Sequence, residues 1–250
     1  MIEFLIQSYI QREAEKIVDR EGRVLLPPTG HRRFFEETAD LMWTNESRWL
    51  SKDDLRVLAE LVAEESQLLS DAASQLITKI TSYAGLSMTR AGQFAFEHDV
   101  YFDYFLSSVL KRQLLSTLNE SHLDRGILPN EVAETAVDRA AVAERVFLQI
   151  LPTLDGSLRH ENRRRNAGLL VAVAARVLGK VSGQRFHHLS MVNVDLDGVE
   201  FEDVEFADST FQGVSLRDAK FRRCRCVNTH AYSVSVSAQT QWIWRGWSLG

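Results

Sequence analysis

Apolar residues recur at helical intervals up to about residue 178 and at a strict five-residue interval after residue 185. Two stripes in the first part have the spacing of one buried helix face: Phe34, Phe35, Leu41 and Met42, then Leu55, Leu58, Leu61 and Val62. Ser51 precedes the second stripe, with Asp54 three residues later, an arrangement that caps the first turn of a helix. We therefore expect residues 1–118 to be mainly helical, with residues 23–31 as the loop between the first two helices.

A short alternating pattern interrupts these helices. Leu86 and Met88, then Phe94 and Phe96, alternate on either side of a turn that contains Gly92, which predicts a β-hairpin. The next segment returns to helical spacing, with an apolar face made of Tyr101, Tyr104, Phe105 and Val109. Helices followed by a hairpin and a further helix are typical of a winged-helix unit.

The segment 119–184 is predicted to be a helical connector. Residues 120–130 have the composition of a linker, and residues 131–151 and 166–179 then form two apolar segments with helical spacing. The second of these is far shorter than the ~20 residues that a membrane span needs, and Arg176 interrupts it. We expect it to be a buried helix.

From residue 186 onward one position of every five is large and apolar, and the position two residues earlier is small. The large positions are Phe186, Met191, Leu196, Phe201, Phe206, Phe211, Leu216, Phe221 and Cys226. This pattern resembles the pentapeptide-repeat family. The resemblance implies a short right-handed quadrilateral β-helix, in which each repeat makes one side and four repeats make a coil. We expect this solenoid at residues 185–230, with little more than two coils, followed at 231–250 by a Trp-rich cap that covers its open end.

The outward positions of the repeats carry a run of acidic residues followed by basic ones: Asp195, Asp197, Glu200, Glu202, Asp203, Glu205 and Asp208, then Arg222, Arg223 and Arg225. One interpretation is a solvated outer face, and the other is an electrostatic docking surface for a protein partner. Some pentapeptide-repeat proteins imitate duplex DNA. Two coils would rise only on the order of 10 Å, whereas one turn of duplex is about 34 Å long, so this column is too short for that role.

The segment 94–108 resembles the end of the winged-helix region in NACHT-type signalling NTPases, also called STAND ATPases. The matching residues are Phe96, His98, Tyr101, Asp103, Tyr104, Phe105 and Ser107. The resemblance implies that His98 approaches the β-phosphate of bound ADP when an ATPase core is present. The alternative is that His98 only caps the helix that begins at Asp99, or packs under the hairpin.

The chain contains no phosphate-binding loop of the form G-x-x-x-x-G-K-[ST]: at the one Gly-Lys pair, Gly179 and Lys180, Ala174 and Val181 occupy the other motif positions. We therefore expect no catalysis and no cofactor, and ATP or ADP only through association with a separate nucleotide-binding half. The resemblances together imply the regulatory or sensor part of a bacterial STAND-type signalling protein with a role in antiphage defence, whose repeats bind a protein partner or trigger. The alternatives are a stand-alone repeat adaptor or scaffold without a nucleotide switch, and an enzyme with an unrecognised site.

Charge and composition limit the classes of partner that we expect for this chain. The formal net charge of −5 argues against general affinity for nucleic acid, and no apolar run predicts membrane insertion. The two cysteines, Cys224 and Cys226, are expected to be reduced core thiols in a cytoplasmic protein, and no four His or Cys residues have the spacing of a zinc site. One local basic cluster contains Arg159, Arg163, Arg164 and Arg165 beside His160. It is either a solvated helix start or a contact for phosphate or an acidic partner.

Overall fold

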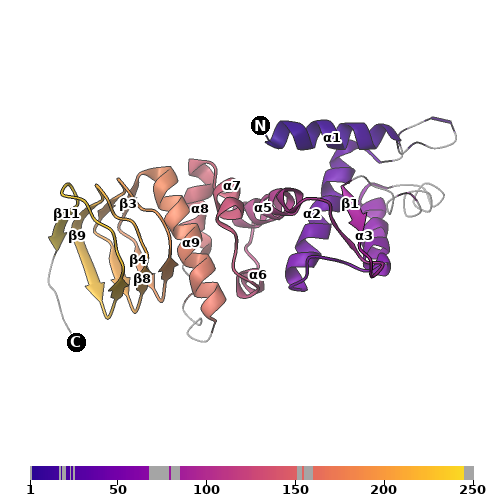
Figure 1. Cartoon of the computed structure of the whole chain (residues 1–250). Coiled ribbons are helices and arrows are strands. Elements are labelled where there is room, and N and C mark those ends of the chain that lie inside the picture. The colour runs from indigo at the N-terminus through magenta and orange to yellow at the C-terminus, as the bar shows by residue number, and fades with distance from the viewer. Residues whose placement is uncertain are drawn as a thin grey trace. The chain divides into compact units, whose positions relative to one another are not determined.

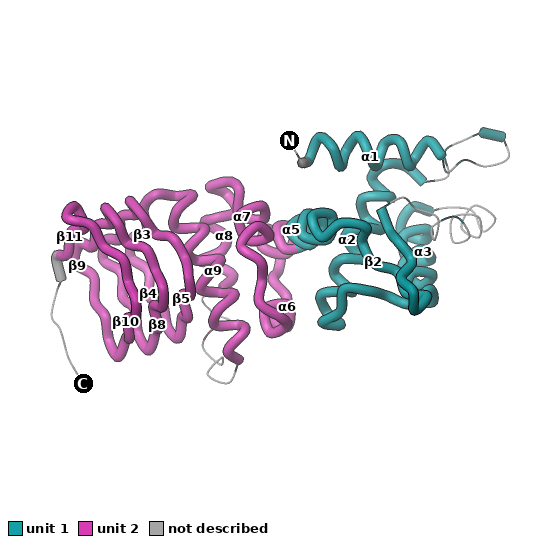
Figure 2. The backbone as a smooth tube through the Cα atoms, in the orientation of Figure 1, with its two compact units in different colours: residues 1–109 teal, residues 110–250 magenta. Residues whose placement is uncertain are grey.

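The computed structural model describes residues 2–16, 26–67, 85–150 and 160–244, together with positions 18, 21, 22, 24, 79 and 154. The chain divides into two compact units, residues 1–109 and 110–250 (Figure 2). The first is helical with a small hairpin. The second consists of helices followed by a parallel-strand β-solenoid, whose strands are drawn in orange to yellow in Figure 1. No helix in the described part of the chain is long and apolar enough to cross a membrane.

The helices of the first unit follow the predicted stripes. They are α1 (Ile2–Lys16), α2 (Pro28–Thr44), α3 (Lys52–Glu65) and α5 (Asp99–Leu115), which continues into the second unit. The predicted loop is shorter than expected because α2 begins at Pro28, a residue that suits the first helical turn, where its missing amide costs nothing. The capping box of Ser51 and Asp54 is confirmed. Leu61 was expected to be buried, but its side chain is 39% exposed.

The predicted hairpin is confirmed. Strands β1 (Leu86–Met88) and β2 (Phe94–Phe96) pair in antiparallel register, and Gly92 in the turn has a φ of 76°. Leu50 joins the hairpin as a third strand position, since its amide and carbonyl each bond to Phe94 at 2.8 Å. The hairpin, α2 and α5 share an aromatic core, in which the ring of Phe105 stacks on Phe96 at 5.8 Å and on Phe35 at 5.1 Å.

The helices of the second unit correct two predictions. The segment predicted as a linker contains the short helix α6 (Glu120–Asp124), and the segment predicted as one helix is two, α7 (Asn130–Ala136) and α8 (Ala140–Ile150). Helix α7 ends because Val137 leaves helical geometry, with φ −104° and ψ 53°. Helix α9 (Glu161–Leu178) is the predicted buried helix, and Gly179 ends it in the left-handed conformation.

A parallel β-solenoid of about three turns follows at residues 180–242. Its strands are β3 (Lys180–Ser182), β4 (Arg185–His187), β5 (Ser190–Val192), β6 (Glu200–Glu202), β7 (Glu205–Ala207), β8 (Thr210–Gln212), β9 (Lys220–Val227), β10 (His230–Tyr232) and β11 (Gln241–Trp244). The solenoid is longer than the predicted 185–230 because the strand after Gly179 and the strand at Trp242 both join its ladders. The expectation of little more than two coils was therefore wrong.

Residues twenty apart lie one above the other in this solenoid. Strands β3, β6 and β9 align Val181 with Phe201 and Phe201 with Phe221. A left-handed residue recurs at every fifth position from Gly183 to Ser233. Most of these positions are Gly, Asn or Asp, the residues that tolerate a positive φ best. The predicted inward positions from Phe186 to Phe221 are all buried.

Helix α9 packs against the first turn of the solenoid, next to β3 and β5 (Figure 1). The approach is close at Gly168, where an added Cβ atom would collide with the carbonyl oxygen of Ser190. The helix supplies an apolar cover for the first turn, whose inward side chains would otherwise face water.

Candidate functional site

The charged outer face of the solenoid is built by its register. Because residues twenty apart are neighbours, the acidic run at 200–205 lies directly beside basic residues at 220–225. Two rows along the solenoid even alternate in sign: Lys180, Glu200 and Lys220 in one, and Arg185, Glu205 and Arg225 in the other. The predicted acidic and basic blocks are therefore not two separate faces.

Between these two rows, Arg223 makes short contacts with two acidic residues. Its guanidinium donates to Asp203 at 2.7 Å and to Glu202 at 2.6 Å, and the ammonium of Lys180 reaches Glu202 from the other side at 2.6 Å. The hydrogen bond from Lys180, followed by that from Arg223, lowers the pKa of Glu202. The bonds to Asp203 and Glu202 raise the pKa of Arg223.

Weaker ion pairs continue the pattern on both sides. Arg222 lies 3.3 Å from Glu200, and Arg225 lies 3.9 Å from Glu205. These pairs were not predicted, although the sequence contains a signal for them. It is the offset of twenty, four repeats of five, between each acid and the base that meets it.

The three predicted aspartates outside this network have different partners. Asp197 accepts hydrogen bonds from the Ser215 hydroxyl at 2.6 Å and from the amide of Arg217 at 2.7 Å, while Asp195 accepts one from the amide of Asp197. Asp208 accepts a hydrogen bond from the side chain of Asn228 at 2.7 Å. The contacts of Asp197 and Asp208 brace one turn against the next, and that of Asp195 is local, so all three aspartates have a structural role.

His98 is exposed and immediately precedes α5. Its carbonyl accepts the amide of Tyr101 at 3.0 Å, and its ring lies 5.6 Å from the ring of Tyr101. These contacts fit the interpretation of a residue at a helix start. The nucleotide role of His98 stays a prediction.

The other residues of the same motif anchor α5 within the first unit. Asp103 lies 3.8 Å from Arg48, whose guanidinium sits 4.0 Å from the centre of the Phe102 ring. The Tyr104 hydroxyl accepts a hydrogen bond from Arg32 at 2.8 Å. Burial raises the pKa of Tyr104, although Arg32 opposes the change. These contacts give Phe102, Asp103 and Tyr104 a packing role within the first unit.

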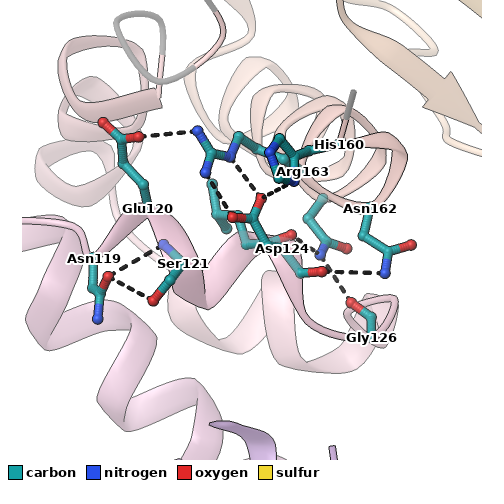
Figure 3. Close-up of polar contacts among 10 residues, drawn as sticks. Asn119, Glu120, Ser121, Asp124, Gly126, His160, Asn162 and Arg163 are labelled. Carbon is teal, nitrogen blue, oxygen red and sulfur yellow. Dashed lines mark hydrogen bonds and ion pairs between the residues drawn. The ribbon is translucent and has the colours of Figure 1, made fainter. Parts of the chain in front are cut away.

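The predicted basic cluster has its acidic partner inside the chain (Figure 3). Arg163, whose side chain is only 11% exposed, donates two hydrogen bonds to Asp124, at 2.7 and 2.6 Å, and a third to Glu120 at 2.9 Å. The imidazole of His160 lies 3.6 Å from Asp124. The hydrogen bonds that Arg163 donates to Asp124 raise the pKa of Arg163. Arg159 lies outside the described residues.

This ion cluster fastens α6 to the start of α9, and a buried amide completes the connection. Asn166 accepts the amide of Leu128 at 2.9 Å and donates to the carbonyls of Leu123 and Gly126. Arg164 extends the contact to the solenoid by donating to the carbonyl of His188 at 2.7 Å. The cluster therefore holds the connector to the β-solenoid. For Arg163 the interpretation as a contact for an acidic partner applies, and that partner lies within the chain.

The cysteines lie in the solenoid wall. Cys224 is buried and Cys226 half-buried, and both are free thiols. Burial raises the pKa of both thiols, that of Cys226 to about 12, so neither has the thiolate character of a nucleophile or metal ligand. Within the described ranges, no group of three or more His, Cys, Asp or Glu residues could hold a metal ion.

No protein-family model matches this chain, and a search of curated proteins found no relative.

Proposed function

We propose that the chain is the non-catalytic regulatory or sensor part of a signalling protein, and that its solenoid is a rigid surface for a protein partner. One observation carries this proposal. The inward side chains of the solenoid are buried in its core. Its outward side chains form ordered rows that are held by contacts between turns, such as that of Arg223 with Asp203. A surface whose charged groups are held in place loses little conformational entropy when a partner binds.

The same proposal includes a right-handed quadrilateral form for the solenoid and a winged-helix form for the first unit. The register of twenty residues and the left-handed residue at every fifth position support a quadrilateral coil with four five-residue sides. Its right-handed sense is the one expected for parallel strands joined by crossovers within a sheet. In the first unit, the order of α2, Leu50, α3 and the hairpin supports a winged helix.

The proposed place in a STAND-type system rests on the resemblance of residues 94–108 and on the exposed position of His98 beside α5. In that setting an ATPase core is supplied by another part of the system, and His98 meets its nucleotide. A role in antiphage defence and a cytoplasmic location are parts of the same proposal. Magnesium-dependent ATP binding by the purified chain would contradict it, because the chain would then carry its own nucleotide site.

The experiment that tests the interaction surface exchanges charges within one pair. In the double variant Asp203→Arg with Arg223→Asp, the pair between positions 203 and 223 is kept with its charges reversed, and the exposed hydrogen bond from position 223 to Glu202 is lost. The original chain and the swapped chain are each used to isolate bound proteins from the native host. Loss of a partner in the swapped chain, with unchanged thermal unfolding, is the expected result. Equal capture of all partners would show that this pair serves the solenoid alone.

A second variant separates the nucleotide relay from a stand-alone adaptor. His98→Ala should alter the signalling output of the host system if His98 reads a nucleotide. It should leave that output unchanged if the helices only support the solenoid. Arg90→Ala, an exposed substitution in the turn of the same hairpin, is the matched control because it lies outside the 94–108 motif.

A further inference from the structure

Stacked aromatic rings run through the interior of the solenoid. The ring of Phe221 lies 5.0 Å from that of Phe201, and the ring of Trp242 lies 4.5 Å from that of Phe221, with an angle of only 6° between the last two planes. This first stack follows β6, β9 and β11 toward the end of the solenoid opposite α9 (Figure 1). One turn of a parallel coil rises by about 4.8 Å, so a flat ring fills one layer of the interior.

A second stack beside the first contains fewer rings. The ring of Phe206 stacks on that of Phe186 at 5.3 Å, and the register then places Cys226 at the next position. A thiol is much smaller than a phenyl ring. The register therefore leaves space for a ring over Phe206, beside the first stack.

An apolar pocket of about 480 Å³ lies at this position. Its aromatic lining includes Phe206, Phe211, Phe221 and Trp242, and the rings of Phe206 and Phe211 meet at 77°. Ala231 also lines the pocket and is exposed, although the register places it above the buried Phe211, so the pocket opens to solvent beside Ala231. Sites for small molecules have volumes of about 300–1,000 Å³, and this pocket falls within that range.

The lining limits the class of molecule that the pocket can hold. Among the residues that the structure describes, those that line the pocket carry no charge. The hydroxyl of Thr229 already donates to the carbonyl of Phe206 at 3.0 Å, and burial raises the pKa of Cys226 to about 12, which keeps its thiol neutral. A charged molecule would lose its hydration here and gain few hydrogen bonds in return. Aromatic rings, in contrast, attract further rings in stacked and edge-to-face geometries.

We propose that this pocket binds a small, neutral, planar aromatic molecule, which lies over Phe206 as the next ring of the second stack. The flat shape of such a molecule matches one layer of the coil, and its edges meet the rings of Phe211 and Trp242. The proposal goes beyond the proposed function, because it concerns the interior of the solenoid and not its outward charges. Either proposal can therefore fail without the other.

The test measures the binding of β-naphthol to the purified full chain by equilibrium dialysis. This probe has two fused planar rings, and its single hydroxyl can stay in water at the open side of the pocket. The matched control ligand is its decahydro derivative, which keeps the carbon skeleton and the hydroxyl but has puckered, saturated rings. We expect one saturable site for β-naphthol, and an affinity for the saturated compound that is lower by about fivefold or more.

Each of two other results would count against the proposal. Equal affinities for the two compounds would overturn the assignment of an aromatic ligand, because any apolar molecule of that size would then suffice. The absence of a saturable site for β-naphthol would overturn the binding site itself.

Two substitutions locate the site. Cys226→Phe supplies the next ring of the stack from the chain itself and should abolish binding, whereas Ala231→Leu narrows the opening and should weaken binding by about tenfold or more. Cys224→Ala is the matched control, because Cys224 is buried on the same strand but does not line the pocket. Unchanged binding in the two pocket variants would overturn the proposal. If Cys226→Phe fails to fold by circular dichroism, Ala231→Leu decides the matter, since its site is exposed.

The thiol of Cys226 reports directly on occupancy of the pocket. In the Cys224→Ala chain it is the one remaining cysteine. A saturating concentration of β-naphthol should slow its modification by a small maleimide at fixed pH by about fivefold or more, because only the unoccupied fraction reacts. Binding of β-naphthol without protection of Cys226 would place the probe elsewhere on the chain and would contradict the proposal.

Discussion

Replacing Gly168 by alanine tests whether α9 and the solenoid touch as closely as the structure shows. In an isolated helix this change is favourable by about 1 kcal/mol, because alanine has the higher helix propensity. Here the new methyl group meets the carbonyl oxygen of Ser190, with the carbonyl carbon 2.7 Å from the Cβ position. The two effects have opposite signs, so the sign of the measured change identifies the dominant one.

We expect the cost of overpacking at this contact to exceed the gain in helix propensity. Overpacking costs about 1–3 kcal/mol, and the upper end applies because the obstacle is a backbone carbonyl of β5, which is held by its pairing with β8. After the gain in helix propensity is subtracted, we expect a net loss of about 2 kcal/mol in the free energy of unfolding of the second unit. That loss changes its unfolding equilibrium by roughly thirtyfold.

The assay is urea unfolding followed by circular dichroism, combined with amide hydrogen exchange of the β5 segment. The expected result is a lower urea midpoint and faster exchange at residues 190–192. Val177→Ala, on a partly exposed site of the same helix, should change the stability by less than about 0.5 kcal/mol. A stabilisation of about 1 kcal/mol in Gly168→Ala would refute the close contact, because helix propensity alone would then account for the result.

Three further predictions concern buried groups. Phe201→Ala removes a fully buried ring that stacks on Phe221 at 5.0 Å, and should lower the unfolding free energy in urea by about 3–5 kcal/mol. Burial lowers the pKa of His31 to about 4. The unfolded chain therefore binds more protons than the folded chain between pH ~6.5 and ~4. The urea midpoint should decrease as the pH is lowered through that window, and this pH dependence should be weaker in His31→Gln. Arg163→Met leaves the carboxylate of Asp124 without its two hydrogen bonds. It should lower the free energy of unfolding by about 2 kcal/mol, measured by thermal unfolding. The control Arg56→Met, at an exposed ion pair, should lower it by less than about 0.5 kcal/mol.

Local chemistry in the sequence was sufficient for the capped helix and the hairpin of the first unit and for the repeat, but not for the division of residues 120–150 into three helices. The capping box at Ser51 and the alternation around Gly92 act within a few residues, so their structures could be predicted from the pattern alone. The five-residue period was equally informative, because a solenoid repeats the same local geometry and buries the same position each time. The length of the solenoid was underestimated because Val181, Ala231 and Val236 depart from the large inward residues while keeping the register.

The sequence by itself therefore determined which residues point inward, and only the tertiary structure decided what the outward residues meet. The partners of Arg163 lie about forty positions away on α6, and those of Arg223 lie one full turn below it. Such contacts depend on where helices dock and how many residues make a coil, which no short window of sequence contains. The same holds for the apolar pocket of about 480 Å³ in the solenoid that Phe206, Phe221 and Trp242 help to line, because such a space arises from the sum of several layers.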